Sequence, residues 1–137
     1  MAFNDDLITQ FRENRGVITE GPFTGRQILL LTTTGAKTGA SRTQPLVYTR
    51  DGENYLIIAS KSGAPTNPDW YYNLRRYPLV TVEVGAEKFK AKATAHVGDS
   101  EWRRLYDQHA VINPGFKDYE LKTTRQIPAV LLERLPD

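Results

Sequence analysis

Apolar and polar side chains alternate along much of the chain, a pattern typical of half-buried β-strands. In residues 88–97 the apolar side chains share one face, and lysine, threonine and histidine side chains share the other. Similar patterns rich in apolar and β-branched residues predict further strands at residues 27–34, 43–50, 55–60, 79–84 and 127–134. Turn signals such as Asp51-Gly52 and Gly85-Ala86 join several of these strands. Strands joined by such short turns run antiparallel, which excludes a parallel Rossmann-type sheet.

Residues 1–15 show a helical spacing of apolar residues instead. The residues that would share one side of the helix are Phe3, Leu7, Ile8 and Phe11. We expect a short amphipathic helix whose apolar face packs on the body of the protein or on a partner chain. A flexible lid and a weak membrane contact are the alternatives. The segment lacks the basic face of most interfacial helices, which argues against the membrane.

Capping signals predict two more helices. Asn67 is a suitable N-cap and Pro68 a suitable first residue for a helix that would end before residue 78. Another helix would begin at residues 99–100 and break at residues 113–115.

The length of 137 residues corresponds to one domain. We therefore expect residues 1–137 to form a single, mainly β (α+β) domain. Its fold would be a small antiparallel barrel with helices inserted between the strands and appended to them.

The sequence lacks the residues or motifs that several kinds of catalytic and metal site require. The absence of cysteine excludes disulfides, a cysteine nucleophile, a thiolate zinc site and an iron–sulfur cluster. His96 and His109 are too far apart to form a metal pair on one helix, so we interpret both as surface residues and expect no metal. The chain has no G-x-S-x-G elbow and no close pair of carboxylates in an apolar setting. If the protein is an enzyme, a bound cofactor must supply the reactive group.

Charge is nearly balanced, because 18 Lys and Arg oppose 16 Asp and Glu for a net charge of +2. A general attraction to nucleic acid is therefore not expected. The chain begins without a signal-peptide pattern and has no apolar run of membrane-spanning length, so we expect a cytoplasmic protein. Residues 26–50, however, contain four basic residues and no acid.

Part of this basic stretch has the composition of an anion-binding loop. In the sequence GAKTGASR, Gly35 and Gly39 allow unusual backbone angles, so peptide N–H groups can converge on an anion. Lys37 and Arg42 add positive charge, and arginine can hold a phosphate through two parallel hydrogen bonds. The spacing does not match a P-loop. A hairpin turn with solvated charges is the alternative interpretation.

A second candidate lies between a predicted strand and a predicted helix. The sequence ASKSGAP at residues 59–65 consists mostly of small residues, which would let a flat ligand approach the backbone N–H groups. Lys61 could serve an anionic group of that ligand. The alternative is a plain connecting loop. Trp70 follows shortly after, and a place in the core is the simpler interpretation of its ring.

Three motifs together resemble the deazaflavin-dependent nitroreductase family. They are G-x-K-T-G-x-x-R-x-x-P-L at residues 35–46, A-S-K-x-G-A-P-x-N-P-x-W-Y-x-N-L at residues 59–74, and Y-x-x-K-T-x-R-x-I-P at residues 119–128. The resemblance implies a split β-barrel that binds coenzyme F420, an 8-hydroxy-5-deazaflavin with a phosphate and an oligoglutamate tail. It also implies transfer of a hydride from the reduced cofactor to an electrophile such as a quinone, a nitroaromatic or an activated alkene.

The resemblance assigns binding roles to the motif residues. Lys37 and Arg42 would meet the phosphate or carboxylates of the tail, while Pro45 and Asn73 would serve the structure first. The full set implied for cofactor binding is Lys37, Thr38, Gly39, Arg42, Pro45, Ser60, Lys61, Gly63, Ala64, Asn67, Trp70 and Asn73.

The acceptor pocket is implied to be aromatic. Tyr48 and Tyr119 are candidates for orienting the acceptor or donating a proton to it, and Phe116 and Tyr119 would line the pocket. Phe116 stands at a position where a hydroxyl-bearing aromatic residue could have been. The N-terminal helix would lie over this pocket as a lid.

Two alternatives use the same fold. A non-catalytic protein could carry the cofactor, a fatty acid or another lipid, and an FMN- or haem-using relative could have the same barrel. The basic loop favours the long anionic tail of the deazaflavin over FMN. A homodimer is possible in each case.

Overall fold

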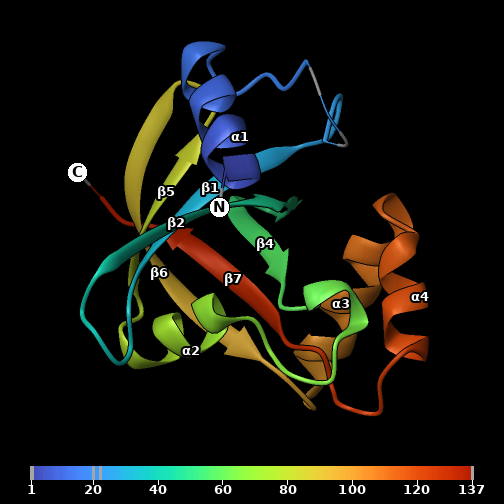
Figure 1. Ribbon diagram of the computed structural model, residues 1–137. Coiled ribbons are helices and arrows are strands. Elements are labelled where there is room, and N and C mark those ends of the chain that lie inside the picture. Colours follow the sequence, from blue (N-terminus) through green and yellow to red (C-terminus); the bar gives the residue numbers. More distant parts are fainter. Residues whose placement is uncertain (1, 20, 22, 137) are drawn as a thin grey trace.

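The computed structural model describes residues 2–19, 21 and 23–136, with side chains from residue 5 onward. Its centre is one antiparallel sheet of seven strands in the order β2-β1-β5-β6-β7-β4-β3, which curls into a half-barrel (Figure 1). The strands are β1 (Ile28–Thr34), β2 (Ser41–Val47), β3 (Thr49–Asp51), β4 (Asn54–Ile58), β5 (Leu79–Val84), β6 (Glu87–His96) and β7 (Ala129–Arg134). The predicted antiparallel, mainly β fold is confirmed.

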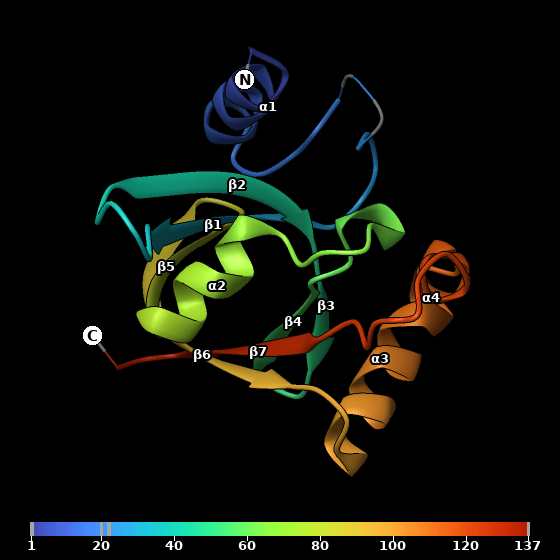
Figure 2. The same cartoon turned by 60° about the horizontal axis from the view of Figure 1, so that its bottom comes forward.

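Four helices and one short turn complete the structure. They are α1 (Ala2–Glu13), η1 (Lys61–Gly63), α2 (Asp69–Arg76), α3 (Ser100–Ile112) and α4 (Gly115–Leu121). Figure 2 shows α2 inside the curve of the sheet, α1 outside it against β2, and α3 with α4 at one end. No helix in the described ranges is both long and apolar enough to cross a bilayer.

Strand β1 explains why the run ILLL is apolar on consecutive positions. Leu29 and Leu31 belong to the core cluster on the α2 side of the sheet, whereas Ile28 and Leu30 belong to the cluster under α1. Because successive side chains of a strand point to opposite faces, a strand covered on both faces needs apolar residues throughout.

Helix α1 is fixed to the outside of β1 and β2. Leu7 and Phe11 are buried there, and both guanidinium Nε and Nη2 of Arg12 donate to the Glu83 carboxylate at 3.0 and 2.9 Å. The side chain of Phe3, predicted to share this face, lies outside the described residues. The apolar face of α1 therefore packs on the body of the same chain.

The predicted strand at residues 43–50 is two strands. Strand β2 begins earlier, at Ser41, and the chain bends at Tyr48, whose N–H donates to the Gln27 carbonyl at 3.1 Å. Pro45 lies opposite Leu30 on β2, which is the outermost strand of the sheet. An edge strand tolerates proline because its missing N–H would face away from the ladder.

The prediction that Asn67 caps α2 is wrong. Pro68, with extended backbone angles, is the N-cap, and the helix begins at Asp69. The side-chain oxygen of Asn67 is already used, because it accepts a hydrogen bond from Arg125 at 2.6 Å.

The predicted break at residues 113–115 ends α3 and also starts α4. Pro114 has φ −59° and ψ −24°, which are helical angles, so the proline that ends one helix begins the next. Phe116 on α4 packs with Leu105 and Tyr106 of α3, and the Tyr106 hydroxyl donates to the Phe116 carbonyl at 2.5 Å.

The interpretation of His109 as a surface residue is also wrong. Its side chain is fully buried, and its Nδ1 lies 2.8 Å from the Thr49 hydroxyl. His109 shares the buried face of α3 with Leu105, Tyr106 and Ala110, at the spacing that places residues on one side of a helix.

Candidate functional site

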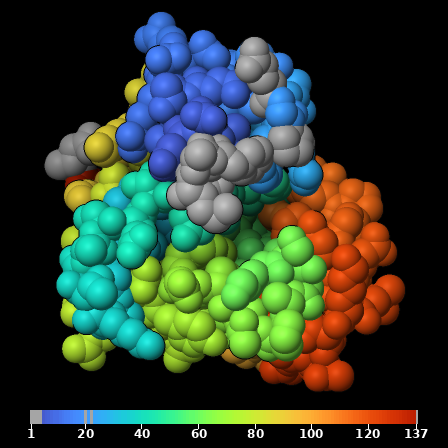
Figure 3. Space-filling view, viewed as in Figure 1, coloured from blue at the N-terminus to red at the C-terminus, as the bar shows by residue number. Residues whose placement is uncertain are grey.

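Two cavities open beside strand β2 and meet at Gln44, which lines both. The first has a volume of about 330 Å³ and is lined by Gly35, Ala36, Lys37, Thr38, Arg42, Gln44, Asp69, Tyr72 and Asn73. The second has a volume of about 290 Å³ and is lined by Phe23, Arg26, Gln44, Pro45, Leu46, Val47, Ile58, Ser60, Lys61, Ser62, Pro68, Trp70, Phe116 and Tyr119. We call the pair the β2 groove. Figure 3 shows the β1–β2 turn, α2, the loop before α2 and α4 gathered on this face.

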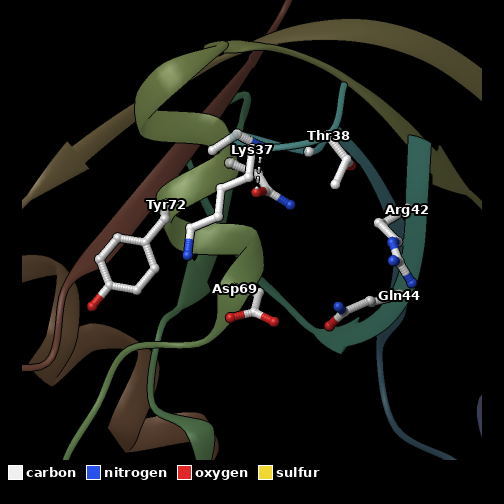
Figure 4. A pocket seen from close by; sticks show the side chains of 9 residues that line it. Lys37, Thr38, Arg42, Gln44, Asp69 and Tyr72 are labelled. Atoms are coloured by element: carbon white, nitrogen blue, oxygen red, sulfur yellow. Dashed lines mark hydrogen bonds between the residues drawn. The ribbon is translucent and has the colours of Figure 1, made fainter. Parts of the chain in front are cut away.

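The first cavity, the basic end of the groove, lies between the β1–β2 turn and α2 (Figure 4). Lys37 projects from the turn and Arg42 from the start of β2, and both are exposed. The side chain of Asn73 on α2 positions this turn through two hydrogen bonds. Its side-chain oxygen accepts the Ala36 N–H at 2.9 Å, and its amide nitrogen donates to the Thr33 hydroxyl at 3.1 Å.

Positive charge in the groove is not neutralised by ion pairs. Arg26, Lys37, Arg42 and Lys61 form no salt bridge with any acid among the described residues, whereas Arg103 and Arg104 on α3 each pair with two acids. Asp69 is the acidic residue among those lining the groove. Such a site has unused capacity for an anionic ligand.

The second cavity, the aromatic end of the groove, is walled mainly by apolar side chains. Trp70 is buried beneath it, and Phe116 and Tyr119 of α4 form a pair with ring centroids 5.1 Å apart and planes at 76°. Pro45 and Val47 of β2 line the cavity as well. A wall of this kind suits a flat ring system.

The loop that leads into this end has an unusual backbone. Lys61, Ser62 and Gly63 have φ values of 46°, 55° and 81°, and Ser60 before them is right-handed at φ −80° and ψ −37°. A right-handed residue followed by a left-handed one turns successive N–H groups toward the same side, an arrangement that binds anions and carbonyl-like oxygens.

The structure brings most of the predicted site residues together in the groove. Those at its basic end are Lys37, Thr38, Arg42 and Asn73, and those at its aromatic end are Pro45, Ser60, Lys61, Trp70, Phe116 and Tyr119. Gly39, Gly63, Ala64 and Asn67 line neither cavity. Gly39 closes the β1–β2 turn by donating to the Gly35 carbonyl at 2.9 Å, and the other three belong to the loop around η1.

Tyr48 is not brought to the groove. Its ring lies edge-on to Tyr55, with centroids 5.5 Å apart, and packs against the core on the α2 side of the sheet. Burial, together with the neighbouring Tyr55 hydroxyl, raises the pKa of Tyr48 above its ordinary value. Of the two predicted tyrosines, Tyr119 is the one that lines the groove.

Sequence reasoning missed several lining residues. Gln44 and Arg26 had no motif signal beyond their place in or before a strand, and Phe23 lies in an irregular segment. Ser62 occupies a variable position of the middle motif, yet its place between Lys61 and Gly63 could have suggested it.

Comparison with known proteins agrees with this geometry. A family model described as F420H(2)-dependent quinone reductase matches residues 6–134. The chain belongs to this family. Members are oxidoreductases that depend on reduced coenzyme F420, so the chain is an F420H2-dependent reductase and F420 is its cofactor.

Relatives of the F420H(2)-dependent quinone reductase family include one from Mycobacterium tuberculosis strain H37Rv. It is 42% identical over 111 residues, which cover 77% of this chain and 72% of the relative. A solved F420-H2 dependent reductase, FDR-A, is 34% identical with a TM-score of 0.71, and the match covers 79% of this chain and 95% of that one. A structure described as a domain-swapped dimer is 30% identical with a TM-score of 0.73, covering 94% and 93%.

Proposed function

We propose that this protein transfers a hydride from F420H2 to a quinone, with both bound in the β2 groove. The observation that carries the proposal is a pair of neighbouring cavities that share Gln44, the first with the unpaired cations Lys37 and Arg42 and the second with an aromatic wall beside the cations Arg26 and Lys61. This order matches a ligand with an anionic tail and a flat ring. When bound, reduced coenzyme F420 supplies the hydride from C5 of its deazaflavin ring.

The basic end would hold the tail of the cofactor. Lys37 and Arg42 would bind its phosphate or carboxylates, Arg42 with the two parallel hydrogen bonds that a guanidinium can offer. Thr38 would contribute from the same turn, although its hydroxyl also accepts the Ala40 N–H at 3.2 Å. Asn73 acts indirectly, since it fixes the turn that carries Lys37.

The aromatic end would hold the ring and the acceptor. Backbone N–H groups at Ser60–Ser62 would bind the polar edge of the ring, with Trp70 beneath and Pro45 beside it. Phe116 and Tyr119 would enclose the acceptor and exclude water from it. The Tyr119 hydroxyl would donate a hydrogen bond to the quinone oxygen, which gains negative charge during reduction.

Nitroaromatics and activated alkenes would serve as further hydride acceptors. They are electrophiles of similar flat shape, and the same Tyr119 hydroxyl could donate to a nitro or carbonyl oxygen. Such a hydroxyl would favour acceptors that carry an oxygen over an unsubstituted aromatic ring.

The test is a direct assay of turnover. Purified protein is mixed with F420H2 and menadione without oxygen, and the return of oxidised cofactor is followed by its absorbance, with a nitroaromatic and an enone run in parallel. Protein-dependent oxidation with menadione is expected. Tight cofactor binding without oxidation by any acceptor would instead indicate a carrier, and tighter binding of FMN than of F420 would overturn the cofactor assignment.

We also propose that the protein forms a homodimer, as the structural neighbour described as a domain-swapped dimer does. Light scattering on a size-exclusion column is expected to give about twice the mass of one 15.5 kDa chain. A mass equal to one chain at all concentrations would contradict this proposal.

A further inference from the structure

Arg125 lies in the segment between α4 and β7, and its side chain reaches the loop that precedes α2. Its Nε donates to the Ala64 carbonyl at 2.8 Å, and its Nη1 donates to the side-chain oxygen of Asn67 at 2.6 Å. Its Nη2 donates to the carbonyls of Ser60 and Ala59 at 2.8 and 3.2 Å. One half-buried guanidinium therefore binds the loop at four points.

All four acceptors are neutral oxygens. Arg125 forms no salt bridge with the acids of the described chain, and burial lowers its pKa below the ordinary arginine value. A charged group held this way costs desolvation free energy without the compensation of an ion pair. The hydrogen bonds that the side chain donates to the loop are the interactions that offset this cost.

The loop bound by Arg125 contains the strained turn η1. Left-handed φ angles are uncommon for residues other than glycine, and Lys61 and Ser62 adopt them in succession. Such backbone strain persists only where surrounding contacts hold it, and it gathers at functional sites. The acceptors of Arg125 bracket the turn, with Ser60 before it and Ala64 after it.

Close packing at the end of α4 also restricts the turn. A Cβ atom on Gly63 would lie 2.9 Å from the Lys122 Cβ and 3.0 Å from the Tyr119 carbonyl oxygen. The turn is therefore held by contacts with α4 as well as by the Arg125 guanidinium. It has little freedom to relax toward right-handed angles while both contacts remain.

We infer that Arg125 is a positioning residue that clamps the two ends of the left-handed turn Lys61–Gly63 and so holds its N–H groups ready for the cofactor. The inference rests on the proposed function, because it takes this turn to be a contact for F420. Arg125 itself lines neither cavity and acts through the loop.

The chemistry of the clamp makes a conservative replacement informative. The planar fork of a guanidinium presents donors in several fixed directions, whereas a lysine ammonium is a compact point charge. Arg125→Lys keeps the charge yet cannot reach acceptors on both sides of the turn. It should therefore behave more like Arg125→Ala than like the wild type.

The experiment measures the loop and the cofactor separately. Hydrogen exchange of residues 60–64 is recorded in protein free of cofactor, and the dissociation constant for F420 is measured by ligand fluorescence. In Arg125→Ala and Arg125→Lys we expect both the exchange rate and the dissociation constant to rise roughly tenfold or more, since several charge-assisted hydrogen bonds are lost. Guanidinium chloride at about 20 mM, far below denaturing concentrations, should partly restore both in Arg125→Ala.

Arg104→Ala is the matched control. Arg104 also donates several hydrogen bonds, to Asp51 and Glu101, but it is exposed on α3 and outside the groove. It should change neither the loop exchange nor the dissociation constant, whatever it does to the melting temperature.

The outcomes separate the inference from the function it rests on. Unchanged exchange at residues 60–64 in both Arg125 variants would overturn the clamp. Faster exchange at residues 60–64 with unchanged affinity for F420 would show that the clamp does not contribute to cofactor binding. If the wild type itself bound no F420, the proposed function would fail, and the exchange data would still decide whether Arg125 holds the turn.

Discussion

His109 is enclosed by α3, α4 and β3, and its Nε2 is buried with no hydrogen-bond partner among the described residues. Its ring stands edge-on to Phe116, with centroids 4.5 Å apart. Burial, aided by the positive charge of Arg26, lowers the pKa of His109 from 6.5 to about 4. The neutral imidazole is thus the form that the packed aromatic wall can accommodate.

This burial predicts that the protein loses stability in mild acid. Between pH 6.5 and about 4, His109 binds a proton in the unfolded chain but not in the folded chain. The free energy of unfolding therefore falls as the pH is lowered through that window, by on the order of 3 kcal/mol. Urea unfolding at several pH values measures this slope.

One substitution assigns the slope. His109→Gln removes the titrating group and should flatten the slope, although it lowers stability at pH 7. An equal slope in wild type and His109→Gln would place the acid sensitivity elsewhere.

Lys37 carries a second prediction at this scale. Lys37→Ala should weaken F420 binding by about 1–2 kcal/mol, because a charge-assisted contact to the tail is lost. Fluorescence titration measures the change. Lys88→Ala, an exposed lysine of β6 with the same change in charge, should bind as the wild type does. Equal affinity of both variants and the wild type would remove Lys37 from the site.

Tyr119 is expected to affect turnover rather than cofactor affinity. Tyr119→Phe keeps the ring packed on Phe116 and removes only the hydroxyl that would face the acceptor. Loss of one such donor should lower kcat with menadione roughly tenfold or more, with little change in the dissociation constant of F420. Weaker cofactor binding at unchanged kcat would instead assign Tyr119 to the cofactor.

At the scale of elements, substitutions in α1 test whether this N-terminal helix is a fixed part of the fold. Phe11 is 1% exposed in the cluster with Leu7, Ile18, Ile28 and Leu30, and no described residue of α1 lines the groove. Phe11→Ala should therefore destabilise the protein by about 3 kcal/mol, while Phe11→Leu should cost less. Thermal or urea unfolding measures both.

The kinetic constants of the same variants test whether α1 acts as a lid over the acceptor pocket. If α1 moves over the acceptor pocket, the KM for menadione should change in Phe11→Leu even where the protein stays folded. If α1 only covers the outer face of β1 and β2, both KM and kcat should match the wild type.

How far the elements could be predicted from sequence depended on whether a local signal exists. Residues 88–97 alternate cleanly and form β6 almost as predicted, at Glu87–His96. The apolar run of β1 was recognisable as a strand, but the two separate cores it serves follow only from the curl of the sheet and the docking of α1. The proline and glycine at residues 113–115 predict a break but not helix α4, which starts there because proline also suits the beginning of a helix.

The site depends on the whole molecule, because it joins segments that are distant in sequence. The curled sheet brings the β1–β2 turn, the loop before α2, α2 itself and α4 to one face, so the segments 35–47, 58–73 and 116–119 each contribute residues to the groove. No local pattern predicts that juxtaposition. The resemblance to a family placed ten of the groove's residues in the predicted site, whereas the clamp by Arg125 required the side-chain contacts.

The distribution of charge over the whole molecule gives the last prediction. A net charge of +2 suggests little attraction for anions, yet four unpaired cations line the groove. Affinity for F420 should therefore fall as ionic strength rises from about 0.1 M to about 1 M, where the Debye length shrinks from roughly 10 Å to 3 Å. Sodium chloride titrations should show a dissociation constant that rises several-fold in the wild type and in Lys88→Ala, with a shallower rise in Lys37→Ala. Affinity that does not respond to salt would mean that burial of the ring, and not the basic end of the groove, determines cofactor binding.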